Sequence, residues 1–292
     1  MDLSFDQDVK ALLHGYLSGQ AGAKAMLDLV TGKVAPSGKL NETYPHKLED
    51  TVLGHDFPVE TKEVFYHESL FVGYRYYQTA EVGVKYPFGF GKSYSSFRYS
   101  ELKVRQNGVE FTLENTGDCA AAEVVQLYIS SESNAVFRPQ RELKNFQKHF
   151  LDKGESKTIF LAFDEYTFRY FDKQTHRFEI EAGDYHIEIG ASSADIRLSG
   201  SIHQSGTLAA QPDQTKRYPH YFSGKVKQLP LGEFETLLDK KITDIEAENS
   251  AGDLLIENDP LSAMKQSKSI LARLSYRFLN AKKKAQYCAG QA

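Results

Sequence analysis

Short runs of β-forming residues separated by turn signals constrain the fold of this chain more than any other feature. They fill residues 97–200 and recur about every ten residues. In the third run, Val125, Leu127 and Ile129 alternate with other residues and so share one face of a strand. The predicted strands are 97–105, 108–114, 122–130, 157–163, 177–181 and 185–190. Strands of this number in about a hundred residues predict an immunoglobulin-like β-sandwich.

Two amphipathic helices are predicted before these strands. Apolar residues at helical spacing from Val9 to Leu17 predict a helix over 8–17. Ala23, Met26, Leu27 and Val30 predict a second helix over 22–31, and Gly32 is the expected C-cap residue. Two helices cannot close a hydrophobic core alone, so we expect the chain to begin inside a larger domain.

An aromatic run between the helices and the strands is the strongest motif of the chain. Residues 66–77 read Tyr-His-Glu-Ser-Leu-Phe-Val-Gly-Tyr-Arg-Tyr-Tyr, and residues 87–94 read Pro-Phe-Gly-Phe-Gly-Lys-Ser-Tyr. We interpret 51–95 as an extended, aromatic-rich linker, since its glycines allow tight turns and close approach to a neighbouring surface. Tyrosines of this density suit a domain junction or a sugar-binding wall. The candidate contact residues are Tyr66, Glu68, Tyr74 and Arg75.

The C-terminal part has a different composition. Residues 204–220 are polar and predict a linker, and helices are predicted at 233–240 and 261–284. In the last helix, Ile270, Leu274 and Phe278 form one stripe beside Lys and Arg residues. Such a helix can dock on its own protein, fray, or touch a membrane or an acidic partner. We expect no membrane contact, because the net charge of the chain is −4.

Composition excludes several classes of protein. The chain has 292 residues, enough for two domains, and its 41% hydrophobic and 25% charged residues are ordinary for a globular protein. The negative net charge argues against nucleic acid as a partner. The acidic N-terminus and the absence of a long apolar run predict a cytoplasmic protein. Cys119 and Cys288 lack paired spacing, so we expect two free thiols.

Several common catalytic patterns are absent from the sequence. Gly91-Lys92-Ser93 is no phosphate-binding loop, because Tyr86 stands where that motif needs glycine. The nine histidines form no helical i, i+4 pair, and no serine lies in a Gly-x-Ser-x-Gly elbow. We therefore expect no metal and no cofactor. A lone Glu63 or Glu68 does not make a glycosidase, which needs two carboxylates.

Ordered motifs over residues 8–200 resemble glycoside hydrolase family 3, the β-glucosidase and β-xylosidase family. The aromatic run resembles the join between its second and third domains. Asn41, Gln78 and Lys92 depart from the usual Pro, Asp and Leu. Upstream, 19–27 and 36–45 resemble the end of the α/β sandwich domain. Downstream, 114–117, 124–128, 138–146 and 183–185 resemble the fibronectin type III-like domain.

The resemblance implies a mainly β chain made of four segments. These are a remnant of the α/β sandwich domain (1–50), the linker (51–95), a fibronectin type III-like β-sandwich (96–203), and a polar linker with a helical tail (204–292). It also implies that the nucleophile is an aspartate in a Ser-Asp-Trp-like motif on a separate (β/α)₈ barrel. This sequence has no Ser-Asp pair and no Trp, so we assign no catalytic residue. The acid/base glutamate would lie upstream of 36–45.

Three functions remain open. The chain can be the C-terminal portion of a β-glucosidase, structural and inactive alone, whose parent enzyme acts on β-glucosides or oligosaccharides. It can be one subunit of a split glycosidase, completed by a separate barrel chain. It can also be a non-catalytic β-sandwich module that binds carbohydrate or protein. Sugar specificity does not follow from the sequence.

Overall fold

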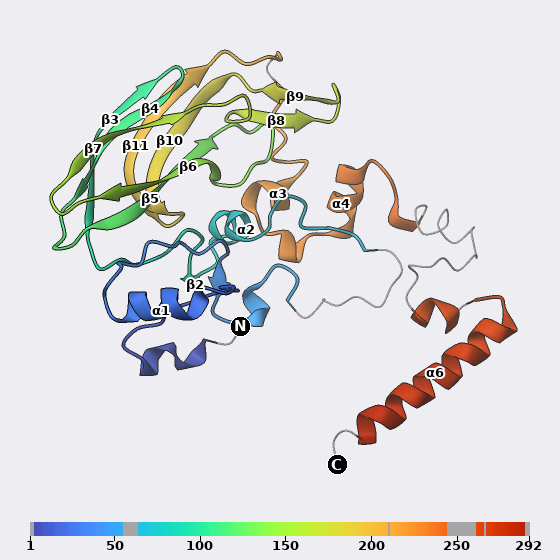
Figure 1. The fold of residues 1–292 in the computed structure, drawn as a ribbon. Helices are drawn as coiled ribbons and strands as arrows, with labels where there is room; N and C mark the ends of the chain where they lie inside the picture. Colours follow the sequence, from blue (N-terminus) through green and yellow to red (C-terminus); the bar gives the residue numbers. More distant parts are fainter. Residues whose placement is uncertain (1–2, 55–63, 210, 244–260, 266, 290–292) are drawn as a thin grey trace. The chain divides into compact units, whose positions relative to one another are not determined.

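The computed structural model describes residues 3–54, 64–209, 211–243, 261–265 and 267–289 (Figure 1). The chain divides into two compact units. Unit 1 comprises Met1–Gly54 and Glu68–Gln228, and unit 2 comprises His55–His67 and Leu229–Ala292. The side chains of 284–289 lie outside the described part.

A β-sandwich forms the centre of unit 1 (Figure 1). One sheet has the strand order β3-β4-β7, and the other has the order β11-β10-β5-β6. All pairings in these two sheets are antiparallel. Their bounds are β3 Phe97–Arg105, β4 Gly108–Asn115, β5 Ala121–Ser131, β6 Glu142–Leu151, β7 Ser156–Ala162, β10 Gly183–Ser192 and β11 Asp195–Gln204. A small hairpin adds β8 Arg169–Asp172 and β9 Arg177–Ile180.

The hydrophobic core lies between the inner faces of the two sheets. The first sheet contributes Phe111 and Leu113, and the second contributes Leu127 and Ile187, all almost fully buried. Val125, Leu127 and Ile129 all belong to this core, which confirms the inward face predicted for the third strand. The opposite face of β5 is therefore left for other segments of the chain.

A buried asparagine closes one end of the sandwich. Asn115 Nδ2 donates to the carbonyls of Cys119 (2.9 Å) and Leu151 (3.1 Å), and its Oδ1 accepts from the Gly117 backbone N–H (3.1 Å). The Ser95 hydroxyl also donates to Oδ1. The Asn-Thr-Gly signal is thus a turn whose side chain ties β4 to β5 and β6.

The strands expected from the sequence are all present, and three further strands between residues 97 and 204 were not predicted. β8 is only four residues long, and β6 has its apolar residues at irregular positions. β11 carried a usable signal, since Ile196, Leu198 and Ile202 alternate with polar residues. An alternation of apolar and polar residues reveals a strand with one apolar face. Strands that are short or have irregular apolar positions are therefore not predicted from the sequence.

Of the two helices predicted near the N-terminus, one is present in the structure and the other is not. The second helix exists as α1 Gly22–Val30, and Gly32 follows it with a positive φ of 72°. The helix predicted over 8–17 is wrong: Ser4–Asp8 is a short 3₁₀ helix (η1), and non-helical chain follows. Tyr16 has a positive φ of 46°, which an α-helix excludes. A short helix is marginal unless its apolar stripe is packed, and here Leu12 and Leu17 are exposed.

The linker region contains short elements of its own. The sequence predicts an extended chain, yet residues 74–79 form the helix α2 (Tyr74–Thr79), which begins after Gly73. The linker strand β2 (Val84–Tyr86) pairs with β1 (Tyr44–Pro45) of the preceding segment, in which a 3₁₀ turn, η2, covers Leu48–Asp50. The helical stretch escapes prediction because it is too short to show a period of 3.6 residues.

Aromatic side chains attach the last segment of unit 1. This segment contains α3 (Pro219–Ser223) and the 3₁₀ turn η3 (Val226–Gln228). Tyr221 of α3 is fully buried, and its ring stacks on Phe137 at 4.9 Å. Phe71 also stacks on Phe137, at 6.2 Å. Phe71, at the middle of the aromatic run, thereby contacts a loop of the sandwich.

Unit 2 is mainly helical. It contains α4 (Leu231–Leu238), the 3₁₀ helix η4 (Leu261–Lys265) and α6 (Ile270–Ala289). Phe234 of α4 is buried against the ring of His67, 4.4 Å away. The helix predicted over 261–284 begins only at Ile270 in the structure. Among the helices that the structure describes, none has the length and apolar character needed to cross a bilayer.

Candidate functional site

The four predicted contact residues are divided between the two units. Tyr66 is exposed and belongs to unit 2, whereas Glu68, Tyr74 and Arg75 belong to unit 1. Glu68 is buried in the turn before Phe71, whose backbone N–H donates to the Glu68 carbonyl (3.0 Å). Tyr74 and Arg75 are neighbours on α2, with the guanidinium 5.8 Å from the ring centroid. The structure thus brings together two of the four residues.

Tyr74 joins three segments of unit 1. Its ring stacks on Phe88 at 4.7 Å and meets Tyr128 of β5 edge-on at 6.2 Å. Its hydroxyl oxygen accepts the Leu143 backbone N–H of β6 at 2.8 Å. Burial raises the pKa of this phenol, so it stays neutral. Tyr74 acts here as a junction residue, with both its ring and its hydroxyl engaged.

Gln126 fixes the 87–91 segment on the outer face of β5. Its Nε2 donates to the carbonyls of Gly89 (3.2 Å) and Ala191 (2.9 Å), and its Oε1 accepts the Tyr128 hydroxyl at 2.6 Å. Gly89 has a φ of 78°, and a Cβ at this position would overlap Oε1 of Gln126. Only glycine combines a positive φ with the absence of a Cβ, so only glycine fits at position 89 without strain.

The backbone of Ser193 is a second anchor for the linker. Its N–H donates to the Phe88 carbonyl at 3.0 Å. Its own carbonyl accepts from Arg141 Nη1 (2.7 Å) and from Gln78 Nε2. Gln78 stands where an aspartate is common in the resembling family, and a carboxylate could not donate this bond. Sequence reasoning missed Ser193, because a backbone contact leaves no signal in the residue type.

The motif at 138–142 supplies charged contacts to the same region. Arg138 pairs with Glu181 at 3.2 Å, and Arg141 pairs with Glu188 at 3.0 Å. All four side chains are largely buried. Glu142 lies 3.7 Å from Arg75 Nε. Arg75, a candidate contact residue, is therefore paired with a carboxylate of the sandwich.

The 36–40 segment is bound to the 87–91 segment. Leu40 N–H donates to the Phe90 carbonyl, and Gly89 N–H donates to the Leu40 carbonyl, both at 2.8 Å. Lys39 Nζ reaches the Gly91 carbonyl (3.1 Å) and Glu123 of β5 (3.0 Å). Glu123 in turn accepts the Tyr99 hydroxyl at 3.0 Å. Motifs far apart in the sequence thus meet at β5.

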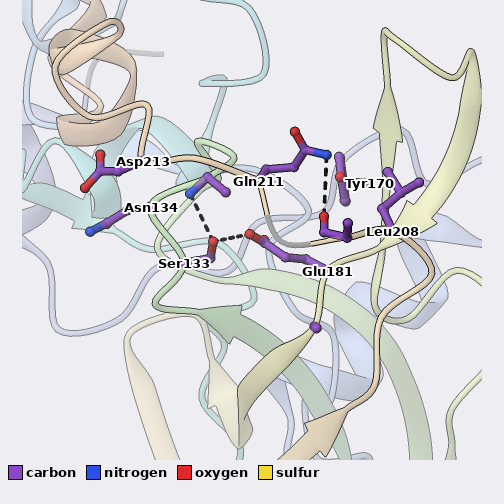
Figure 2. A pocket seen from close by; sticks show the side chains of 10 residues that line it. Ser133, Asn134, Tyr170, Glu181, Leu208, Gln211 and Asp213 are labelled. Atoms are coloured by element: carbon purple, nitrogen blue, oxygen red, sulfur yellow. Dashed lines mark hydrogen bonds between the residues drawn. The ribbon is translucent and has the colours of Figure 1, made fainter.

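A cavity of about 300 Å³ opens among loops at the β8–β9 end of the sandwich (Figure 2). Ser133 and Asn134 come from the loop after β5, Tyr170 from β8, and Glu181 from the turn before β10. Leu208, Gln211 and Asp213 line it from the segment after β11. The lining combines polar side chains with one aromatic ring and apolar residues such as Leu208, so a small molecule there would meet both hydrogen-bonding and apolar groups.

The carboxylates of this cavity are already engaged. Glu181 pairs with Arg138 and accepts the Ser133 hydroxyl. Hydrogen bonds from the Thr215 hydroxyl and backbone N–H lower the pKa of Asp213. A glycosidase acid needs a raised pKa, so Asp213 is not prepared for that role. Among the described residues, no group of three or more potential metal-ligating side chains gathers around one point.

A second hollow, of about 260 Å³, borders the junction itself. Tyr74, Tyr77 and Gln78 of α2 line one wall, and Ser193 lines another. Burial raises the pKa of Tyr77 to about 12, so this phenol is neutral at physiological pH. The hollow contains one carboxylate, Glu81, whereas glycoside hydrolysis requires a pair.

Two family models match the chain. The glycosyl hydrolase family 3 C-terminal domain matches residues 1–94, and a fibronectin type III-like domain matches residues 123–193. These ranges contain the segments that the structure brings together on β5 and β10.

Curated relatives extend the match. The thermostable beta-glucosidase B of Acetivibrio thermocellus is 40% identical over 216 residues, which cover 71% of this chain and 29% of the relative. An exo-alpha-(1->6)-L-arabinopyranosidase of Bifidobacterium longum is 40% identical over 211 residues, covering 70% of this chain and 28% of that enzyme. The chain spans less than a third of the length of these relatives.

Solved structures share the fold. A family 3 beta-glucosidase of Bifidobacterium adolescentis superposes with a TM-score of 0.64 at 38% identity, over 80% of this chain and 33% of that one. The beta-glucosidase of Kluyveromyces marxianus in complex with glucose gives a TM-score of 0.66 at 35% identity, over 70% of this chain and 26% of that one.

Replacing Gly89 by alanine should release the 87–91 segment from β5. We expect Gly89→Ala to lower the free energy of unfolding by about 3 kcal/mol, because positive φ and overlap with Gln126 act together. The matched control is Gly154→Ala, where φ is 72° but a Cβ would meet no atom within 4 Å. The control should cost about 1 kcal/mol. Urea unfolding followed by circular dichroism measures both, and equal losses would contradict the close approach.

Buried tyrosines should make the chain sensitive to alkali. Burial raises the pKa of Tyr128 above its ordinary value of about 10. Above that pH the unfolded chain loses the phenol proton while the native chain keeps it, so stability falls as pH rises. In Tyr128→Phe, the slope of this loss should be smaller by about 1.4 kcal/mol per pH unit. Exposed Tyr66→Phe is the control, and an unchanged slope in Tyr128→Phe would refute the prediction.

Proposed function

Because the chain belongs to glycoside hydrolase family 3, we propose that it serves as the non-catalytic C-terminal portion of a β-glucoside-hydrolysing enzyme. Its role is to hold the end of an α/β domain against a fibronectin type III-like sandwich. The observation that carries this proposal is the meeting of residues 36–40, 87–91 and 138–142 on β5 and β10. By itself the chain does not hydrolyse glycosides.

The chemistry of the described residues supports a structural role. Retaining glycoside hydrolysis uses two carboxylates about 5 Å apart, one as nucleophile and one as acid with a raised pKa. Glu181 and Glu188 are tied to arginines, and the pKa of Asp213 is lowered. These carboxylates stabilise the loops around the junction.

The names of the relatives also bear on specificity. One curated relative is a beta-glucosidase and another is an arabinopyranosidase, yet both are 40% identical to this chain. A portion shared equally by enzymes with different sugars is suited to support rather than to sugar selection. For the parent enzyme we propose a substrate class, β-glucosides or oligosaccharides, and no particular sugar.

An activity assay tests the proposal. The purified chain should release no product from aryl β-glucosides above the rate in buffer. Glu68→Gln is the control for contaminating enzyme, because Glu68 is the buried carboxylate of the aromatic run. Turnover that remains with the chain after repeated purification, and is lost in Glu68→Gln, would show that this chain is catalytic.

A split enzyme is the second candidate. Exposed apolar side chains favour it, since Leu12, Leu13 and Leu17 and, on α1, Leu27 and Val30 reach solvent. Contiguous exposed apolar surface marks an interaction site or an aggregation hazard. The partner would be a chain that carries a catalytic barrel. Recovery of a second polypeptide with β-glucosidase activity on co-purification supports this candidate, and a clean inactive monomer counts against it.

A carbohydrate-binding or protein-binding module is the third candidate. Two aromatic side chains favour it, since Phe146 and Phe150 are 63% and 58% exposed on one face of β6. Around the β8–β9 hairpin, the rings of Phe171 and Phe178 meet at 76°, which gives no flat platform for a sugar ring. Retention on insoluble glucan that is lost in Phe146→Ala would favour this module.

We further propose that the protein works in the cytoplasm. The free thiol of Cys119 supports this location, because unpaired cysteines persist in reducing compartments. Cys288 lies outside the described side chains.

A further inference from the structure

Five apolar residues of α6 lie on one narrow arc of the helix, whereas Leu279, 41% exposed, falls outside it. At 100° per residue, Ile270, Leu271, Leu274, Phe278 and Ala281 fall within about 100° of the circumference. The structure leaves this arc uncovered: Ile270 is 68% exposed, Leu271 76% and Phe278 71%. Half-buried Ala272 and Tyr276 lie on the other side of the helix, and η4 contacts α6.

Charge is distributed unevenly between this tail and the rest of the chain. Residues 261–292 hold seven of the 35 Lys and Arg residues and none of the 39 Asp and Glu residues. Residues 261–292 are therefore strongly basic although the whole chain has a net charge of −4. Since charges interact over only about 8 Å at physiological ionic strength, the local charge decides what this helix attracts.

The cations border the apolar arc on both sides. Lys282 follows the edge marked by Leu271, while Arg273 and Arg277 precede the edge marked by Ile270. Long basic side chains at such borders can bury their methylene stems and keep their charges in a polar layer. An apolar stripe with flanking cations is typical of helices that lie in a membrane interface.

This arrangement favours a lipid surface over a protein surface. A second copy of α6 would bring Arg277 and Lys282 close to like charges of the partner helix, which is unfavourable. A protein partner would need an apolar groove bordered by carboxylates along both edges. A bilayer with anionic headgroups offers acyl chains below the helix and negative charge on both sides.

We propose that α6 is an interfacial helix that binds anionic phospholipid bilayers, with its axis in the membrane plane and the arc from Ile270 to Ala281 inserted. The 20 residues of α6 extend about 30 Å, so the contact is long rather than deep. The helix would hold unit 1 near a membrane without crossing it. This property is independent of the function proposed for unit 1.

The absence of tryptophan from the chain allows a direct test. Phe278→Trp in the full chain gives a single reporter on the arc. Its emission should shift to shorter wavelength with vesicles of phosphatidylglycerol and phosphatidylcholine, and stay unchanged with phosphatidylcholine alone. Phe146→Trp is the matched control, since Phe146 is also well exposed but lies on β6. Its emission should not respond to either vesicle.

Charge reversal provides the second readout. Lys282→Glu with Lys283→Glu should weaken sedimentation with the anionic vesicles by about tenfold or more. Lys148→Glu with Lys153→Glu changes the net charge equally on the sandwich and should leave binding intact.

Three results would overturn the proposal. One is an emission of the Phe278→Trp variant that does not respond to anionic vesicles, and another is binding that survives charge reversal on α6. The third is a reporter already shielded from a soluble quencher without lipid, since α6 would then be covered by its own protein or a second copy.

Discussion

The side-chain amide of Gln126 is the interaction on which the arrangement of unit 1 depends. It bonds the Gly89 and Ala191 carbonyls and accepts the Tyr128 hydroxyl, so one buried residue of β5 joins the linker to two strands. A side-chain amide is required here, because this residue donates two hydrogen bonds through its NH₂ group and accepts one through its oxygen. The interaction also requires glycine at 89, since any larger residue would displace the amide.

Charged and aromatic contacts extend from this point. Arg141 and Gln78 converge on the Ser193 carbonyl, Lys39 reaches Glu123, and Tyr74 stacks on Phe88. These contacts are largely buried, and breaking a buried pair costs far more than breaking an exposed one. The motifs that identify the family are therefore residues whose contacts hold the sandwich against the preceding domain segment. Their structural role explains why they support a family assignment but no reaction.

The two units differ in how they use apolar surface. Unit 1 buries its apolar residues between two sheets and exposes others near the N-terminus, where Leu12 and Leu17 lie. In α6, by contrast, five apolar residues are continuous along one arc that cations border. The first pattern is typical of surface that another protein domain covers, and the second is typical of an interfacial helix.

The sequence by itself determined the β-sandwich, the helix α1, the stripe of α6 and the family, because each leaves a local trace in periodicity, turn residues or motif order. It failed where the outcome depends on distant partners. The stripe from Val9 to Leu17 predicted a helix, but no packed surface holds it in that form. Residues 74–79 are helical although their run reads as extended chain. Only the tertiary structure decided that Arg75 faces Glu142, that Ser193 anchors the linker and that Glu181 is paired with Arg138. The physical reason is that these charge pairs and backbone hydrogen bonds join residues dozens of positions apart in the chain, and no local pattern encodes which partner is chosen.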